Sequence, residues 1–365
     1  MDRQSYRWFH LSFVSNQKGT TWFEISLISF LCPLSVLVLA KLEKWLNQAS
    51  KPWKLLIEFA VLAGPLLVTF TNLVTPFDFV FWFTILTAFI NLVPNFKTNT
   101  TSSGNLVFLS NYRASMLLVT AICILGVDFQ AFPRRFAKTE DFGFGLMDIG
   151  VGSFVFSAGT VSPNHQSKIG KNAYKTLPLL ILGILKFLFV KMSNYHTVMS
   201  EYGAHWNFFI TLAIVQLICG TCTCYLQRKT TFALAFILAL AHELTLTRFH
   251  YSWILDLTDT QRLQSSFWIA NAEGLVSLSG YAALYLMGSC LRQAINSLLS
   301  PQKWKVTTLW LVFLACIWIG LLNEGLLTMP SRRLCNLSYI IWMVVYNMML
   351  LVLFSGVQYI TGKQP

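Results

Sequence analysis

The sequence predicts an all-α polytopic integral membrane protein, a single bundle of about eleven transmembrane helices with short loops. Of its 365 residues, 55% are hydrophobic and only 12% are charged, and the chain contains 30 Phe and 12 Trp. Eleven mostly apolar segments approach the roughly 20 residues that a helix needs to cross a bilayer. They span residues 23–40, 55–74, 76–96, 114–130, 147–161, 177–192, 206–225, 231–247, 273–291, 306–326 and 335–357.

The short loops leave no room for a separate soluble domain, so any site must be built from helix ends and their connections. We predict a lumenal N-terminal segment at residues 1–22, a transmembrane domain at 23–357 and a short C-terminal tail at 358–365. A polar run follows Arg3 and Arg7, and no small-residue cleavage site closes the first apolar segment. That segment is therefore interpreted as a signal anchor.

The positive net charge is best explained by membrane topology. The chain has 27 Lys and Arg and a formal net charge of +12, but its cations occur singly or in pairs between apolar segments. This distribution argues against a nucleic-acid partner, which would need one basic stripe. A lumenal N-terminus places just over half of the Lys and Arg in the cytosol, including Lys168, Lys171 and Lys175. Nearly all loop carboxylates then face the lumen, so chemistry is expected on that side.

The first concentration of charge follows the fourth apolar segment. Asp128 ends that segment, and Arg134, Arg135 and Lys138 lie just beyond it. A carboxylate and several cations this close together beside a bilayer are expected to interact with one another. Pro133 cannot continue a helix cleanly, so the chain is predicted to turn there and to fold Lys138 back toward Asp128.

The second polar concentration lies between the sixth and seventh segments. Its sequence, SEYGAHWNFF at 200–209, offers an acid, a base and an amide flanked by aromatic rings: Glu201, Tyr202, His205, Trp206 and Asn207. An aromatic belt at the membrane interface would explain the tyrosine and the tryptophan alone. A glutamate and a histidine four residues apart are less easily explained in that way.

Two further pairs of polar residues stand at the starts of apolar segments. Asn271 and Glu273 begin the ninth segment, where a carboxylate either caps the helix or joins a site. Arg332 and Arg333 precede the last segment on the predicted lumenal side, against the positive-inside tendency, and are therefore candidate site residues.

No metal site is predicted. Cys219, Cys222 and Cys224 have no second Cys or His cluster nearby that could complete a zinc site. The pair His242-Glu243 resembles the start of a zinc-protease motif, but Leu246 stands where the second histidine would be needed.

Several of these stretches resemble the inositol acyltransferases of glycosylphosphatidylinositol (GPI) biosynthesis. This family includes the animal class W protein and the fungal GPI-anchored wall transfer protein. The resemblance rests on FVSNQKGTT at 13–21, DFQAFPRRFAKTE with MDIGVGSFVFS at 128–157, SEYGAHWNFF at 200–209, NAEG at 271–274 and SRRLCNLSYIIW at 331–342. These stretches stand in the family's order across most of the chain.

The resemblance implies a multi-pass enzyme of the endoplasmic reticulum membrane with a lumenal N-terminus. Such an enzyme is a membrane-bound O-acyltransferase that moves a fatty acyl group, typically palmitoyl, from acyl-CoA to an inositol hydroxyl of glucosaminyl-phosphatidylinositol. The expected partners are this glycolipid, palmitoyl-CoA or a similar acyl-CoA, and membrane lipid. Acyl-CoA is a co-substrate, and no other cofactor is expected.

The resemblance also suggests roles for individual residues. Asp128 and Lys138 match the family's Asp and Lys on either side of FPRRF, and acyl transfer to a hydroxyl needs a base and a group that stabilises the oxyanion. His205 is the alternative base. Arg134 and Arg135 suit a phosphate of the lipid or of CoA, although they could simply anchor at lipid headgroups. The remaining predicted substrate-binding residues are Glu201, Tyr202, Trp206, Asn207, Asn271, Glu273, Arg332 and Arg333.

The sequence also departs from the family. The family usually has about thirteen spans in a longer chain, and it often has an acidic residue and a histidine where Thr197 and Val198 stand here. The alternative function is a membrane carrier or lipid flippase without acyl-transfer chemistry. Carriers usually show internal repeats with broken helices in matching positions, and no convincing repeat is visible in this sequence.

Overall fold

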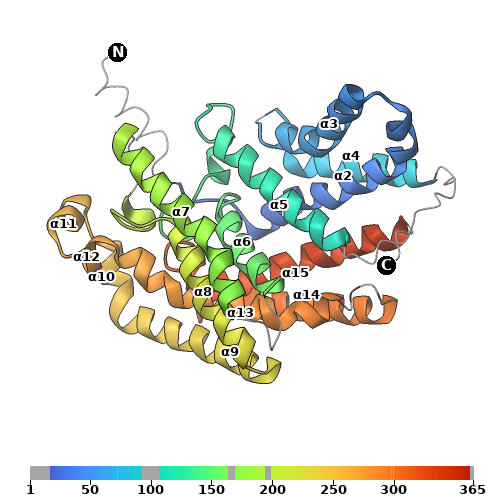
Figure 1. Cartoon of the computed structure of the whole chain (residues 1–365). Coiled ribbons are helices and arrows are strands. Elements are labelled where there is room, and N and C mark those ends of the chain that lie inside the picture. Colours follow the sequence, from blue (N-terminus) through green and yellow to red (C-terminus); the bar gives the residue numbers. More distant parts are fainter. Residues whose placement is uncertain are drawn as a thin grey trace, which may run out of the picture. The chain divides into compact units, whose positions relative to one another are not determined.

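The computed structural model describes residues 17–71, 73–92, 107–162, 169–193, 199–296, 298 and 300–361. Over this part of the chain the structure consists of helices and their connections, with no strands (Figure 1). The helices are α2 (Trp22–Gln48), α3 (Lys51–Thr69), α4 (Pro76–Leu92), α5 (Val107–Gly126), η1 (Arg134–Phe136), α6 (Asp148–Thr160), α7 (Ile169–Ser193), η2 (Met199–Glu201), α8 (Phe208–Tyr225), α9 (Arg228–Thr245), η3 (Leu246–His250), α10 (Tyr251–Leu255), α11 (Asp259–Gln264), α12 (Phe267–Ala270), α13 (Ala272–Asn296), α14 (Pro301–Asn323) and α15 (Leu337–Ile360).

The predicted fold class is confirmed, and each of the eleven predicted apolar segments coincides with a helix. Within the described ranges, nine helices are long and apolar enough to cross a membrane. The apolar part of α4 is shorter, Pro76–Ile90, and α6 has only 13 residues, so the count of eleven spans is not confirmed. Most of the predicted N-terminal segment, the end of the predicted tail, Lys168, Thr197 and Val198 lie outside the described residues. The predicted domain boundaries stay a prediction.

The chain forms two compact units. Unit 1 comprises Met1–Gly150, Ala294–Leu314 and Tyr346–Pro365, and unit 2 comprises Val151–Gln293 and Ala315–Val345. The boundaries fall within α6, α13, α14 and α15, so each of these helices contributes residues to both units.

In unit 1, α2 packs against α3, α4 and α5 and buries Ile25, Ile28 and Leu31 completely. The C-terminal half of α15 is tied to this group by buried hydrogen bonds. The Tyr346 hydroxyl lies 2.6 Å from the Ser29 hydroxyl, and Tyr112 donates to Asn347 Oδ1 at 2.6 Å. Pairing these polar groups inside an apolar environment avoids the cost of leaving them unbonded.

In unit 2, α7 packs along α8, and α6 lies directly against α13 (Figure 1). Gly159 and Gly288 allow the close approach of α6 and α13. A Cβ at Gly159 would overlap the backbone of Tyr285, and a Cβ at Gly288 would overlap the backbone of Phe156. Small residues at a helix contact let two backbones approach closely inside a membrane.

A single π-helical turn, η3, joins α9 to α10 in unit 2. The Tyr251 N–H donates to the Leu246 carbonyl, five residues back, where an α-helix would use the residue four back. This turn changes the register between α9 and α10, so it sets which way the carbonyl groups of α10 point.

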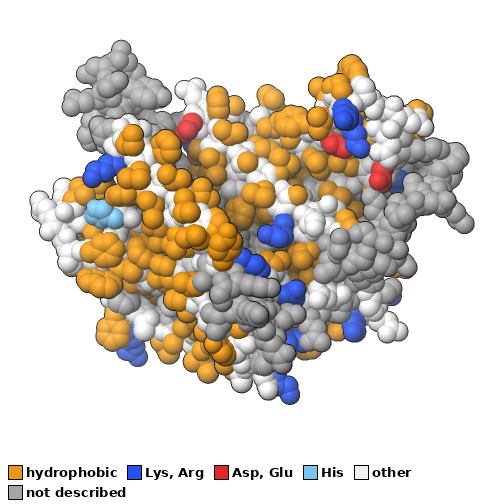
Figure 2. All heavy atoms as spheres, in the orientation of Figure 1, with side chains coloured by type: hydrophobic (Ala, Val, Ile, Leu, Met, Phe, Trp, Pro, Cys, Tyr) orange, Lys and Arg blue, Asp and Glu red, His pale blue; other side chains and the backbone are white. Residues whose placement is uncertain are grey.

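The surface is largely apolar, as expected for a chain surrounded by lipid. Figure 2 shows hydrophobic side chains spread over the visible face, with only scattered Lys, Arg, Asp and Glu. Exposed apolar residues on α7 are Leu177, Ile181, Leu182, Ile184, Leu185, Leu188, Phe189 and Met192. Exposed apolar residues on α14 are Val306, Leu309, Trp310, Val312, Phe313, Leu314 and Ile317. These faces are suited to contact with lipid chains.

Candidate active site

The first candidate group of residues lies in unit 1, after α5. The helix ends at Gly126, well before Pro133, and Asp128 lies exposed in the turn that follows. The Phe129 and Phe132 amides close this turn by donating to the Gly126 and Phe129 carbonyls at 2.9 and 3.2 Å. A carboxylate just beyond an apolar helix is thereby held at the helix end, where it remains accessible.

Aromatic packing anchors the turn that carries the two arginines. Phe132 precedes η1 and Phe136 is its last residue; both are buried, with ring centroids 6.0 and 6.4 Å from that of Phe70 on the loop after α3. Their own centroids are 6.3 Å apart. The Phe70–Phe132 and Phe132–Phe136 contacts are edge-to-face, a geometry that stabilises pairs of aromatic rings. Pro133 immediately precedes η1, so the predicted turn at this proline is confirmed.

Arg134 and Arg135 have different environments. Arg134 folds back on its own turn and donates to the Phe132 and Phe129 carbonyls at 3.1 and 3.0 Å. Burial lowers the pKa of its guanidinium, and the charge of nearby Asp128 opposes that shift. Arg135 is 41% exposed and pairs with Glu24, with 3.1 Å between Nε and Oε1. Arg135 is thus the more accessible of the two guanidinium groups.

Lys138 lies exposed between the buried residues Ala137 and Thr139. The chain beyond it pairs with the segment before α2, because Thr20 N–H donates to the Phe144 carbonyl at 2.7 Å. Gly143 has φ +136°, which favours glycine, and a Cβ there would lie 2.6 Å from the Lys18 carbonyl oxygen. The predicted approach of Lys138 to Asp128 stays a prediction.

The second candidate group lies in unit 2, where the segment 199–207 docks on the start of α13. Three backbone or amide bonds make this contact: His205 N–H donates to Asn271 Oδ1 at 2.8 Å, Ala204 N–H to the Ala270 carbonyl at 2.9 Å, and Gly274 N–H to the Tyr202 carbonyl at 3.0 Å. Gly203 has φ +117°, and a Cβ there would lie 2.5 Å from Asn271 Cα. The segment therefore needs glycine at this point.

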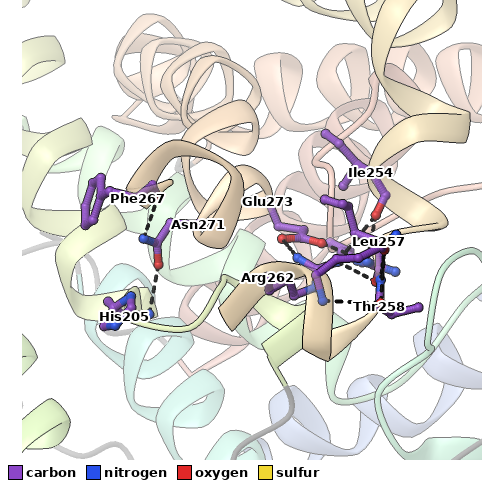
Figure 3. A network of polar contacts seen from close by, with 10 residues as sticks. His205, Ile254, Leu257, Thr258, Arg262, Phe267, Asn271 and Glu273 are labelled. Atoms are coloured by element: carbon purple, nitrogen blue, oxygen red, sulfur yellow. Dashed lines mark hydrogen bonds and ion pairs between the residues drawn. The ribbon is translucent and has the colours of Figure 1, made fainter. Parts of the chain in front are cut away.

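The His205 side chain is exposed and lies near two aromatic rings, of which Figure 3 shows Phe267. Its ring centroid is 6.0 Å from that of Phe187 on α7 and 6.5 Å from that of Phe267 on α12. The His205 backbone N–H donates to Asn271, so the main chain that carries the imidazole is held in place. The side chain itself remains accessible to a substrate.

Trp206 and Asn207 hold the segment to α8. Trp206 Nε1 donates to Thr211 Oγ1 at 2.8 Å. Asn207 caps α8 by accepting from two backbone N–H groups, and its own amide donates to the Gly183 carbonyl at 2.9 Å. The bonds of Asn207 and Asn271 are structural, and their predicted contact with substrate stays a prediction.

The first turn of α13 also carries a buried ion-pair network (Figure 3). Glu273, fully buried in the first turn of α13, pairs with Arg262 and with Arg333, the latter at 2.7 Å. Arg262 also donates to the Ile254 and Leu257 carbonyls at 3.4 and 3.2 Å, and Arg333 donates to the Ile254 carbonyl at 3.2 Å. Two buried cations thus share one buried carboxylate, and backbone carbonyls satisfy further guanidinium N–H groups.

Arg332 points to a different carboxylate from its neighbour. It lies 3.8 Å from Glu201, and it is almost fully buried. Burial raises the pKa of the adjacent Tyr202 phenol, and the positive charge of Arg332 opposes that shift. The Arg332 carbonyl accepts from Tyr281 at 2.8 Å. Glu201, Tyr202 and Arg332 therefore form one polar group.

The structure thus places the predicted residues in two sets. Asp128, Arg134, Arg135 and Lys138 belong to unit 1. The other predicted site residues belong to unit 2, where they are joined by the contacts above: Glu201, Tyr202, His205, Trp206, Asn207, Asn271, Glu273, Arg332 and Arg333. Sequence reasoning missed Arg262 and Glu24, the partners of Glu273 and Arg135. The sequence feature that could have identified Glu24 is its position in the first turn of an apolar helix, where a carboxylate interacts favourably with the helix N-terminus.

Comparison with known proteins identifies the family. The GWT1 family model matches residues 6–364. The chain belongs to the GWT1 family. All five stretches that carried the resemblance fall within the matched residues, including the turn with Arg134 and Arg135 and the segment with His205.

Curated relatives in the GWT1 family are named GPI-anchored wall transfer protein 1. The protein of Cryptococcus neoformans var. grubii is 34% identical over 67% of this chain and 48% of its own length. That of Schizosaccharomyces pombe is 36% identical over 71% of this chain and 58% of its own length. That of Gibberella zeae is 30% identical over 97% of this chain and 81% of its own length. The chain spans about half the length of the Cryptococcus relative.

Proposed function

We propose that this GWT1-family protein acylates the inositol ring of glucosaminyl-phosphatidylinositol, with acyl-CoA as the donor, in GPI-anchor biosynthesis at the endoplasmic reticulum. The relatives' name, GPI-anchored wall transfer protein 1, supports a role in the GPI pathway. The observation that carries the proposal is the pair of accessible charges, Asp128 and Lys138, on either side of the aromatic-anchored turn in a chain of this family.

In the proposed reaction, the Asp128 carboxylate takes the proton of the inositol hydroxyl. The hydroxyl oxygen attacks the thioester carbonyl, and the ammonium of Lys138 donates to the oxyanion that forms. Collapse of the tetrahedral intermediate forms the ester, breaks the carbon–sulfur bond and releases CoA thiolate, which takes up the proton from Asp128. The transfer is direct, without an acyl-enzyme.

Arg135 is the better candidate of the two arginines for binding a phosphate. It is exposed, and its fork-shaped guanidinium pairs through Nε with Glu24, which leaves its terminal nitrogens in a position to meet an anionic ligand. Arg134 donates to two carbonyls of its own turn, an arrangement that favours a role in shaping the turn around Asp128.

The test uses the purified chain in lipid with radiolabelled acyl-CoA and glucosaminyl-phosphatidylinositol. Formation of the acylated glycolipid supports the proposal, and movement of lipid across the bilayer without product supports the carrier alternative. Asp128→Asn keeps the shape of the side chain but cannot accept the proton, so turnover is expected to fall about a hundredfold to ten-thousandfold. Near-normal turnover of Asp128→Asn together with an inactive His205→Ala would move the role of base to His205.

A further inference from the structure

Asp148 makes a contact that the proposed chemistry does not use. The residue is 1% exposed at the start of α6, and one carboxylate oxygen, Oδ2, accepts two hydrogen bonds from Thr139. The Thr139 backbone N–H donates at 3.1 Å and the hydroxyl at 2.7 Å. A buried carboxylate in the first turn of a helix is therefore tied to the residue that directly follows Lys138.

A second set of bonds closes the same loop from the other side of Lys138. Met147 N–H donates to the Phe136 carbonyl at 3.1 Å, and Asp148 N–H donates to the Gly145 carbonyl at 3.0 Å. Gly145 fits because a Cβ there would lie 2.5 Å from the Ala137 carbonyl oxygen and would also overlap the Asp148 carboxylate. The chain is thus fixed at Phe136 and again at Thr139, and Lys138 is the exposed residue between these points.

The segment before α2 also contacts this loop. Glu140 N–H donates to the Gln17 carbonyl at 3.3 Å, and Gly19 lies so close to the loop that a Cβ there would be 2.8 Å from Thr139 Cγ2. A lysine side chain has four rotatable bonds. The region that its ammonium can reach is therefore limited mainly by the position and direction of the Cα–Cβ bond, which the backbone fixes. Groups that stabilise a transition state work best when their supporting residues are fixed in advance.

We propose that Asp148 is a positioning residue for Lys138: its carboxylate clamps Thr139 and so fixes the direction in which the catalytic ammonium enters the site. This inference rests on the proposed function, because it gives Asp148 a role in the same reaction. The competing explanation is that Asp148 only stabilises the start of α6 through its charge. The two explanations differ in whether the effect of Asp148 on turnover depends on Lys138.

The experiment is a double-mutant cycle on the full chain in lipid nanodiscs. Asp148→Ala is expected to lower kcat about tenfold to a hundredfold in the native background, with little change in KM for either substrate. In a Lys138→Met background the same change is expected to have no further effect, since the group being positioned is absent. Asp148→Asn keeps an oxygen that can accept both bonds, so its kcat is expected to stay within about threefold of native.

Thr139 supplies a milder pair of variants in case Asp148→Ala fails to fold. Thr139→Val has nearly the same shape but loses the hydroxyl donor, and it is expected to lower kcat, whereas Thr139→Ser keeps the donor and the native rate. Hydrogen exchange of the 137–147 amides is expected to be faster in Asp148→Ala and Thr139→Val. The matched control is Asp78→Ala, which removes a carboxylate bonded to Thr75 in the first turn of α4 and is expected to leave kcat unchanged.

Each outcome decides between the explanations. An equal fall in kcat in the native and Lys138→Met backgrounds would assign Asp148 a purely structural role and overturn the proposal. Faster exchange of the loop with unchanged kcat would do the same. Absence of product from the native chain would overturn the proposed function, and the positioning role with it, whereas normal product formation with multiplicative effects overturns the positioning role alone.

Discussion

Removing the carboxylate of Glu273 is expected to destabilise the protein more than removing either arginine that pairs with it. In Glu273→Gln the side chain keeps its shape, but Arg262 and Arg333 then face a neutral amide, and the amide nitrogen can only repel a guanidinium N–H. Both arginines are buried, so water cannot take over the role of the lost anion. Breaking a buried ion pair by removing one partner costs about 3–5 kcal/mol, which corresponds to roughly a hundredfold to several-thousandfold in the unfolding equilibrium.

Arg262→Met is expected to cost less, about 1–3 kcal/mol, because Glu273 keeps its pair with Arg333 and the Ile254 carbonyl keeps the Arg333 donor. Arg262 Nε has no hydrogen-bond partner among the described residues, so its loss removes no bond at that atom. The double variant, Arg262→Met with Glu273→Gln, is expected to be more stable than the sum of the two single changes predicts. It removes one of the two cations that the glutamine variant leaves without an anion.

The assay is the free energy of unfolding in mixed micelles, measured by titration with sodium dodecyl sulfate. Glu24→Gln is the control, because it breaks a pair with a partly exposed arginine, Arg135, and such pairs contribute about 0–1 kcal/mol. If Arg262→Met proves more damaging than Glu273→Gln, or if the two changes are additive, the account of one carboxylate shared by two buried cations is wrong.

Three further outcomes are expected. Arg135→Ala raises KM for the phosphorylated lipid or for CoA more than it lowers kcat, because phosphate binding is present in both the ground and transition states. Steady-state kinetics with each substrate varied checks this, and a collapse of kcat at constant KM would contradict it. Gly203→Val destabilises the protein by about 1–3 kcal/mol, because its φ of +117° and its close approach to Asn271 exclude a Cβ. Faster amide exchange at residues 199–207 is the measurement, and Gly320→Val, at an open position, is the control. A glycosylation acceptor engineered at Asn172 stays unmodified while one inserted after Glu140 is modified, as the predicted cytosolic and lumenal sides require.

The helices could be predicted from sequence because long apolar runs leave a chain in lipid little choice but to bond its backbone internally. Their ends were less predictable. The helix expected to reach residue 130 ends earlier, at Gly126. By contrast, α2 continues to Gln48, well past residue 40, because polar residues extend a helix beyond the apolar part from which it was predicted. Snorkelling lysines and tryptophans make such extensions inexpensive at the membrane edge.

The sequence singled out Glu273 and Arg333 as candidate site residues, but it did not predict their pairing. The place of Glu273 at a helix start favoured a cap or a site, and neither alternative pointed to Arg262, a lone cation in a polar connection that topology alone would explain. Arg333 comes from a third segment, before α15. These charges meet only through tertiary packing, which single-sequence periodicity does not record. The same holds for Glu24 and Arg135 in unit 1.

The π turn at Leu246–His250 gives the chain an uneven tolerance for changes of length. A π turn holds one residue more than an α turn, so deleting one residue there would let α9 run into α10 as an unbroken α-helix. Four residues of an α turn cover nearly the same rotation as the five residues of a π turn, so α10 would keep its orientation about the helix axis. The Ile254 carbonyl would then still accept from both Arg262 and Arg333. A residue lost from the regular turns of α9 would instead rotate the helix beyond it by about 100° and turn this carbonyl away from both guanidinium groups.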